Sequence, residues 1–142
     1  MRIAVASDHA GFQMKQDLAA LLRQQGHEVE DLGPEGGASV DYPDYARRVA
    51  ERVSRGEAER GVLVCGSGIG MAMAANRVAK VRAANVYSPD SARLSREHND
   101  ANVITLGARL LTGPEAAALL EGWLTTPFLG GRHEARVAKI EA

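Results

Sequence analysis

The segment Gly61–Ala75, GVLVCGSGIGMAMAA, brings together residue types that could hold a negative charge and move a proton. An apolar run ends at Cys65, the only cysteine of the chain, and Gly66, Gly68 and Gly70 follow at alternate positions. Glycines let backbone N–H groups approach a ligand closely, and the start of the following helix adds partial positive charge. We therefore expect an anion-binding loop here, because a simple tight turn would need only one glycine.

The loop lacks the marks of a nucleotide site. A dinucleotide fingerprint needs a glycine where Met71 stands, and it belongs on the first strand with an acidic residue about 20 positions later. The Lys-Ser/Thr pair of a P-loop is also missing. The charge to be held can thus be a phosphate or a charge that develops during a reaction.

Cys65 lies at the mouth of this loop. A thiol near helix-terminal N–H groups is favoured as thiolate, which can act as a nucleophile or as a general base. The simpler interpretation is a small buried apolar residue, and for a cysteine taken alone that is the commoner case.

Two further motifs carry acid–base groups. In SDHAG, Asp8 could accept a substrate hydroxyl and His9 could donate to phosphate, or Ser7 or Asp8 could merely cap the next helix. In REHNDAN, His98 could shuttle a proton and Asn99 could donate to an oxyanion. The alternative for Asn99 is the C-cap of a solvated helix.

Three arginines stand near glycines, namely Arg109, Arg132 and Arg136. Arg132 and Arg136 are four residues apart and share one helical face, which is mildly unfavourable unless an anion joins the two charges. Paired arginines suit bidentate recognition of phosphate. The alternative is surface charge, or pairing with Glu134 or Glu141.

The elements that must position these residues alternate along the chain. Strands are predicted at 3–6, 27–33, 61–65, 81–87 and 102–107. Helices are predicted at 10–26, 42–56, 70–79, 88–99, 112–126 and, as a short last helix, 130–142. This alternation predicts a single doubly wound, Rossmann-like α/β domain over residues 1–142, with a five-stranded parallel sheet flanked by helices on both faces. Ligands of such folds bind beyond the carboxyl ends of the strands, where the motifs above occur.

The composition limits the classes of partner that the protein is expected to bind. The formal net charge of −1 provides no global field toward nucleic acid or an anionic membrane. No apolar stretch approaches the roughly 20 residues that span a bilayer, and one cysteine cannot form an internal disulfide. We expect a cytoplasmic protein that binds neither nucleic acid nor membrane.

Taken together, the motifs resemble those of type B ribose-5-phosphate isomerases. That group belongs to a sugar-phosphate isomerase family that also includes galactose-6-phosphate and allose-6-phosphate isomerases. The resemblance spans nearly the whole chain and rests on ASDHAG, VDYPDYA, VCGSGIGMAMAANRV, HNDANVITLGAR and GGRHEARV.

The resemblance implies an aldose–ketose isomerase of the pentose phosphate pathway, which interconverts D-ribose 5-phosphate and D-ribulose 5-phosphate through a cis-enediolate. It makes Cys65 the base between C1 and C2 and His98 the ring-opening acid, with Ser67 and Asp8 assisting at the sugar oxygens. The groups that it assigns to the enediolate are the N–H groups of Gly66, Ser67, Gly68, Ile69 and Gly70 and the side chain of Asn99. The residues that it assigns to the phosphate are His9, Arg109, Arg132 and Arg136.

The resemblance also implies no cofactor, no metal and a homodimer, possibly paired into a tetramer, whose active sites are shared across the interface. A C-terminal helix of about residues 131–142 is expected at that interface. His98, Asn99 and Arg109 are expected to face Cys65 of the other subunit.

Two departures from the family pattern bear on the mechanism. Many members have Thr where this chain has Ser67, but the hydroxyl is kept. Some members use a Glu as base, and the corresponding GIGMAM holds no acid, which favours the cysteine mechanism. Two alternatives remain: an isomerase of a six-carbon sugar phosphate (allose or galactose 6-phosphate), and a non-catalytic phosphosugar- or nucleotide-binding module.

Overall fold

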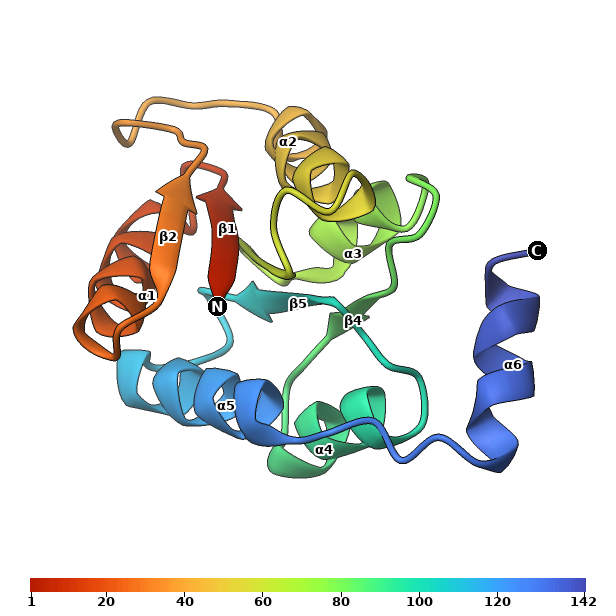
Figure 1. The fold of residues 1–142 in the computed structure, drawn as a ribbon. Coiled ribbons are helices and arrows are strands. Elements are labelled where there is room, and N and C mark those ends of the chain that lie inside the picture. The colour runs from red at the N-terminus through yellow and green to blue at the C-terminus, as the bar shows by residue number, and fades with distance from the viewer.

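The computed structural model describes residues 1–142 and contains one five-stranded parallel sheet in the order β2-β1-β3-β5-β4 (Figure 1). The strands are β1 Arg2–Ser7, β2 Glu28–Asp31, β3 Arg60–Cys65, β4 Ala83–Asn85 and β5 Val103–Gly107. The helices are α1 Phe12–Gln24, α2 Tyr42–Ser54, α3 Ile69–Ala75, α4 Pro89–Glu97, α5 Gly113–Thr125 and α6 Arg132–Ile140. The predicted α/β fold class is confirmed.

The sheet is covered on both faces, because successive strand side chains point to opposite sides. In β3, Val62 and Val64 belong to the core beneath α1, α4 and α5, which also holds Trp123. Leu63 and Cys65 belong to the second core, beneath α2 and α3. Figure 1 shows the two helical layers on either side of the strands. Cys65 is thereby directed toward α3, the helix that follows its own strand.

The segment between α3 and β4 differs from the prediction. Helix α3 ends at Ala75 rather than near residue 79, and β4 has three residues rather than seven. Asn76 gives the reason, since its side chain donates to the Ala83 carbonyl (3.0 Å) and accepts from the Ala83 N–H (2.7 Å). An amide that pairs with backbone in this way competes with helix continuation and closes the connection onto the sheet edge.

Helices α4 and α5 start at reciprocal caps. Ser88 and Ser91 exchange hydrogen bonds at the start of α4, and Thr112 and Glu115 do the same at the start of α5. Each cap satisfies two backbone donors that a helix end otherwise leaves free. The start of α4 matches the predicted range, with Ser88 as the cap and Pro89 as the first helical residue. None of the six helices combines the length and the hydrophobicity that crossing a membrane requires.

Helix α6 lies at one edge of the molecule, on the side of β4 and α4 (Figure 1). His133 is its only buried residue. The apolar side chains of Leu129, just before it, and Ile140, at its end, are exposed. Packing within one chain therefore explains little of the position of α6.

One half-buried charged side chain has a buried nitrogen without a hydrogen-bond partner. Arg60, at the start of β3, lies with its guanidinium over the Trp123 ring, and its Nη1 finds no hydrogen-bond acceptor in the protein. Burial, and secondarily the nearby Arg96, lowers the pKa of Arg60 to about 10. Both effects disfavour the charged guanidinium in the folded state, the first by removing water and the second by repulsion.

We expect Arg60→Met to raise the melting temperature. A buried unpaired donor costs about 1–3 kcal/mol, and the cation–π contact returns about 0.5–1 kcal/mol, so a net gain near 1 kcal/mol corresponds to roughly 3 °C. Thermal unfolding followed by circular dichroism measures the change. Arg2→Met is the matched control, since Arg2 forms only an exposed ion pair with Glu59 and should change stability little. A lower melting temperature for Arg60→Met would contradict the expectation.

Candidate active site

A left-handed turn shapes the loop between Cys65 and α3. Gly68 adopts φ +81°, a conformation that residues with a side chain rarely adopt. A Cβ at this position would lie 2.4 Å from Oδ1 of Asn85 and 3.0 Å from the carbonyl carbon of Leu106. Both the backbone conformation and the surrounding atoms therefore require glycine at position 68.

The turn brings a hydrogen-bond donor to the thiol. The Gly68 N–H donates to Cys65 Sγ at 3.1 Å, and Cys65 is 5% exposed at the carboxyl end of β3. A backbone N–H directed at sulfur stabilises the thiolate relative to the thiol. Cys65 is thus a buried core residue and also a thiol with a stabilising donor, so the two interpretations from the sequence are compatible.

The other N–H groups of the loop divide into engaged and free donors. The Ile69 N–H donates to Ser67 Oγ at 3.2 Å, which leaves the Ser67 hydroxyl hydrogen able to donate elsewhere. The N–H groups of Gly66 and Ser67 make no hydrogen bond within the protein. The Gly70 N–H, in the first turn of α3, is also without a partner, so free donors lie on both sides of the engaged Gly68 and Ile69.

A cavity of about 520 Å³ opens at this loop. The residues that line it are Asp8, Tyr42, Cys65, Gly66, Ser67, Ile69, Gly70, Met73, Arg109 and Leu110. Tyr42 packs so closely on Gly70 that a Cβ there would lie 2.5 Å from its ring. The predicted thiol, hydroxyl, carboxylate and one arginine are therefore gathered around one space.

Asp8 takes the capping position weighed from the sequence and also faces the cavity. It is 8% exposed, and its Oδ1 accepts the Gly11 N–H at 2.9 Å, just before α1. Asp8 also lines the cavity, and its Oδ2 has no hydrogen-bond partner in the protein. The cap thus holds the carboxylate in place while one oxygen stays available.

His9 follows Asp8 directly in the chain but does not itself line the cavity, and it is exposed. Its Nδ1 accepts the Val40 N–H at 3.3 Å, from the loop that precedes α2. An accepting Nδ1 in a neutral imidazole places the ring hydrogen on Nε2. His9 can therefore donate from Nε2 to an anion.

Arg109 lies beside Cys65 of its own chain, which corrects the expectation that it faces the other subunit's Cys65. Its backbone N–H donates to the Gly66 carbonyl at 3.0 Å, and its guanidinium packs against the Gly66 Cα. The reason is the parallel pairing of β3 with β5, which sets Cys65 opposite Gly107 and so brings the next residues alongside the glycine loop.

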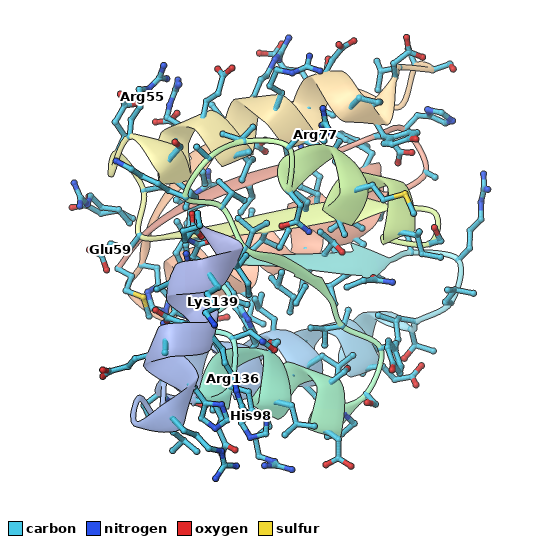
Figure 2. The ribbon with its side chains drawn as sticks, turned by 90° about the vertical axis from the view of Figure 1, so that its right-hand side faces the viewer. Arg55, Glu59, Arg77, His98, Arg136 and Lys139 are labelled. Atoms are coloured by element: carbon cyan, nitrogen blue, oxygen red, sulfur yellow. The ribbon has the colours of Figure 1, made fainter.

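The remaining predicted residues form a second group, away from the cavity. His98, Asn99, Arg132 and Arg136 are absent from the cavity lining. His98 caps the end of α4 and stacks on His133 of α6, with ring centroids 4.3 Å apart and planes 14° from parallel. Figure 2 shows His98 next to Arg136 at the foot of α6.

Arg132 and Arg136 have no carboxylate partner in the structure. Neither forms an ion pair or side-chain hydrogen bond, and Glu141 pairs with Arg82 instead. Their two guanidiniums, next to the stacked rings of His98 and His133, make a cationic cluster that no carboxylate pairs with. Such a cluster suits an anion that bears more than one negative charge.

Sequence reasoning missed two residues here. Tyr42 has no functional role in the prediction, although it borders the cavity through its contact with Gly70. His133 lies between residues that were singled out, yet nothing local to it indicates that it stacks on His98. The one signal in the sequence that could have pointed to His133 is that it directly follows Arg132. No group of three or more His, Cys, Asp and Glu side chains is arranged to hold a metal ion.

His133 makes stability depend on pH. Burial, followed by the charges of His98, Arg132 and Arg136, lowers the pKa of His133 below its usual value. The unfolded chain therefore binds this proton at a higher pH than the folded chain, and stability falls as pH drops from about 6.5 through the lowered pKa.

We expect His133→Gln to reduce the loss of melting temperature between about pH 7.5 and about pH 5. His27→Gln is the control, because His27 lies at the opposite side of the sheet, before the edge strand β2. Melting curves across the pH range test this, and an unchanged slope for His133→Gln would refute it.

Comparison with known proteins gives a consistent result. The family described as Ribose/Galactose Isomerase matches residues 3–140. Ribose-5-phosphate isomerase B of Escherichia coli is 43% identical over 141 residues, which cover 99% of this chain and 95% of that protein.

Solved structures agree closely with the fold. Ribose-5-phosphate isomerase B of Clostridium thermocellum is 46% identical, with a TM-score of 0.98 and coverage of 99% of this chain and 95% of that one. The Mycoplasma genitalium enzyme, determined with bound ribulose-5-phosphate, is 41% identical with a TM-score of 0.95 and covers 99% and 93% of the two chains. The chain therefore belongs to the ribose/galactose isomerase family and is an enzyme of the aldose–ketose isomerase class.

Proposed function

We propose that this chain interconverts D-ribose 5-phosphate and D-ribulose 5-phosphate, as a cytoplasmic enzyme of the pentose phosphate pathway. The observation that carries the proposal is the Cys65 thiol held by the Gly68 N–H at the mouth of a cavity with Asp8, Ser67 and Arg109. The Mycoplasma genitalium relative with bound ribulose-5-phosphate supports the choice of substrate.

Proton transfer is the role of Cys65. The thiolate removes the proton from C2 of the open-chain aldose, the electrons move onto the C1 carbonyl oxygen, and an enediolate forms. A proton then passes from the C2 hydroxyl to the C1 oxygen, and the same thiol returns its proton to C1, so that C2 becomes the ketone carbonyl and C1 a hydroxymethyl group. A thiolate is a stronger base than an ordinary carboxylate, and a base whose pKa is near the working pH transfers protons most efficiently.

The enediolate needs donors that do not have to break other bonds. The N–H groups of Gly66 and Ser67 are free, whereas those of Gly68 and Ile69 already serve Cys65 and Ser67. We assign the free pair to the developing oxyanion, with Asn99 as a further donor. Preorganised donors of this kind commonly contribute about 10²–10³ in rate.

Opening of the furanose ring requires an acid at the ring oxygen, and we assign this to His98. Asp8 Oδ2 and the Ser67 hydroxyl are placed to hold the sugar hydroxyls. The phosphate is assigned to Arg109, which lines the Cys65 cavity, to His9 Nε2–H, and to Arg132 and Arg136, whose charges are uncompensated.

These assignments require a second copy of the chain. The residues around Cys65 and the cationic cluster on α4 and α6 do not meet within one chain, so a homodimer with shared sites joins them. The cavity rim supports this, because Ile69, Met73 and Leu110 are 49%, 68% and 67% exposed. An apolar rim and the sparsely packed α6 are both surfaces that a partner would bury.

A six-carbon sugar phosphate is the second candidate, since the matching family includes galactose isomerases. Steady-state rates on ribose 5-phosphate, allose 6-phosphate and galactose 6-phosphate distinguish the two. We expect the highest kcat/KM with ribose 5-phosphate. Turnover of only the six-carbon substrates would favour the second candidate, and binding without any turnover would indicate a non-catalytic module.

Mixing inactive variants tests the shared site. Cys65→Ala and His98→Ala chains should each lose at least about 10² in kcat. When they are unfolded together and refolded at equal amounts, half of the dimers are mixed and each mixed dimer has one intact site, which predicts about a quarter of wild-type activity. If both residues act within one subunit, confirmed mixed dimers will stay inactive.

A further inference from the structure

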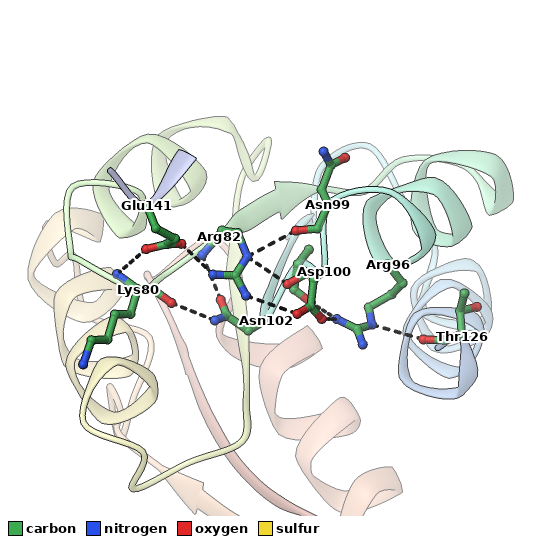
Figure 3. A network of polar contacts seen from close by, with 9 residues as sticks. Lys80, Arg82, Arg96, Asn99, Asp100, Asn102, Thr126 and Glu141 are labelled. Carbon is green, nitrogen blue, oxygen red and sulfur yellow. Dashed lines mark hydrogen bonds and ion pairs between the residues drawn. The ribbon is translucent and has the colours of Figure 1, made fainter. Parts of the chain in front are cut away.

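A network of polar side chains joins the turn of His98 and Asn99 to both ends of the α6 segment (Figure 3). Its centre is the carboxylate of Asp100, which lies between two guanidiniums. Arg96 Nη1 is 2.8 Å from Oδ1, and Arg82 Nη2 is 3.5 Å from Oδ2. None of these three residues lines the Cys65 cavity.

Arg82 connects the His98–Asn99 turn with the end of α6. Its Nε donates to the carbonyl of Asn99 (3.2 Å) and to that of Asp100 (3.1 Å). Its Nη1 pairs with Glu141, the residue that caps α6, and Glu141 Oε2 also accepts the Lys80 N–H at 3.0 Å. A single guanidinium thus fixes two segments that are about forty residues apart in the chain.

Arg96 fixes the chain ahead of α6. This buried residue donates from Nε to the Thr126 carbonyl at 3.1 Å and from Nη1 to the Ala101 carbonyl at 2.7 Å. Close by, the Leu129 N–H donates to the Glu97 carbonyl at 3.2 Å. Both ends of the α6 segment are therefore attached to the same turn.

Backbone conformation in the network is costly, which shows how strongly it is held. Lys80 (φ 69°) and Asp100 (φ 49°) are the only non-glycine residues of the chain with positive φ. Asn102 secures the first by donating to the Lys80 carbonyl and accepting from the Arg82 N–H, both at 2.8 Å. Such conformations cost about 1 kcal/mol or more each and persist where the surroundings overdetermine them.

Glu141 is the one polar tether of the helix itself. No other side chain of residues 127–142 makes a hydrogen bond or ion pair to the rest of the protein. Beyond the stack of His133 on His98, α6 is largely exposed. The orientation of Arg132 and Arg136 relative to His98 therefore depends on this tether.

We propose that Arg82 and Glu141 are positioning residues that hold α6 against the His98–Asn99 turn, so that its arginines and His98 meet the substrate as one rigid unit. This rests on the proposed function, in which Arg132 and Arg136 bind the phosphate. Neither Arg82 nor Glu141 needs to touch the sugar. Side chains held in the productive geometry bind an anion without first losing conformational freedom.

Glu141→Ala tests the tether. We expect the KM for ribose 5-phosphate and the dissociation constant of inorganic phosphate to rise together, by about tenfold, with kcat changed much less. Glu141→Gln keeps one acceptor oxygen, for either Arg82 or the Lys80 N–H, and should fall between wild type and Glu141→Ala. Glu57→Ala is the matched control, because it also removes a carboxylate from surface arginine pairs, at the end of α2, and should leave both constants unchanged.

A double-mutant cycle separates positioning from general loosening. If Glu141 acts through α6, Glu141→Ala will weaken phosphate binding little further in an Arg136→Ala background. Equal effects in both backgrounds, or unchanged phosphate binding in Glu141→Ala, would overturn the proposal. Calorimetric titration with phosphate needs no turnover, so a wild type that binds phosphate but does not convert ribose 5-phosphate would refute the proposed function alone.

Discussion

The hydrogen bond from the Gly68 N–H to Cys65 Sγ is the contact on which the reactive end of the sheet depends. It exists because Gly68 takes a left-handed conformation that turns the chain back over the end of β3. Asn85 and Leu106 occupy the space that a side chain at position 68 would need, so close packing and backbone conformation both require glycine there. The same turn starts α3 and leaves two N–H groups free beside the sulfur.

A division of charge follows from this arrangement. The thiol is buried with Asp8 on one side, while His98, His133, Arg132 and Arg136 gather on another surface of the same chain. Keeping His133 neutral limits the repulsion in that cluster, and its lowered pKa reflects the burial and neighbouring charges that favour the neutral ring.

Rigid support of the second surface comes from polar contacts rather than from apolar packing. Helix α6 buries only His133, whereas Arg82, Arg96 and Asp100 connect its flanks to the turn after α4. Asp100 carries both the ion pairs and a left-handed backbone, so it sets the direction of the chain immediately after His98 and Asn99. Charged networks of this kind hold geometry well, because breaking one member leaves another charge unpaired.

The sequence by itself determined the five strands, their parallel arrangement and the two helical layers. These follow from local patterns, since apolar periodicity and glycine spacing act within a few residues. The spacing of Arg132 and Arg136 also placed both on one face of a helix, whereas their lack of a carboxylate partner was decided by the structure. The predicted extension of α3 to residue 79 was wrong. The helix ends before Asn76, because the amide of Asn76 pairs with the backbone of Ala83, seven residues later.

Only the tertiary structure decided which residues meet. The register of β3 and β5 places Arg109 beside its own Cys65, and the docking of α6 stacks His133 on His98 and pairs Glu141 with Arg82. Tyr42 reaches the cavity only because α2 crosses Gly70. Each of these contacts joins segments far apart in the chain, and their formation depends on how whole elements pack, which no local pattern of residues encodes.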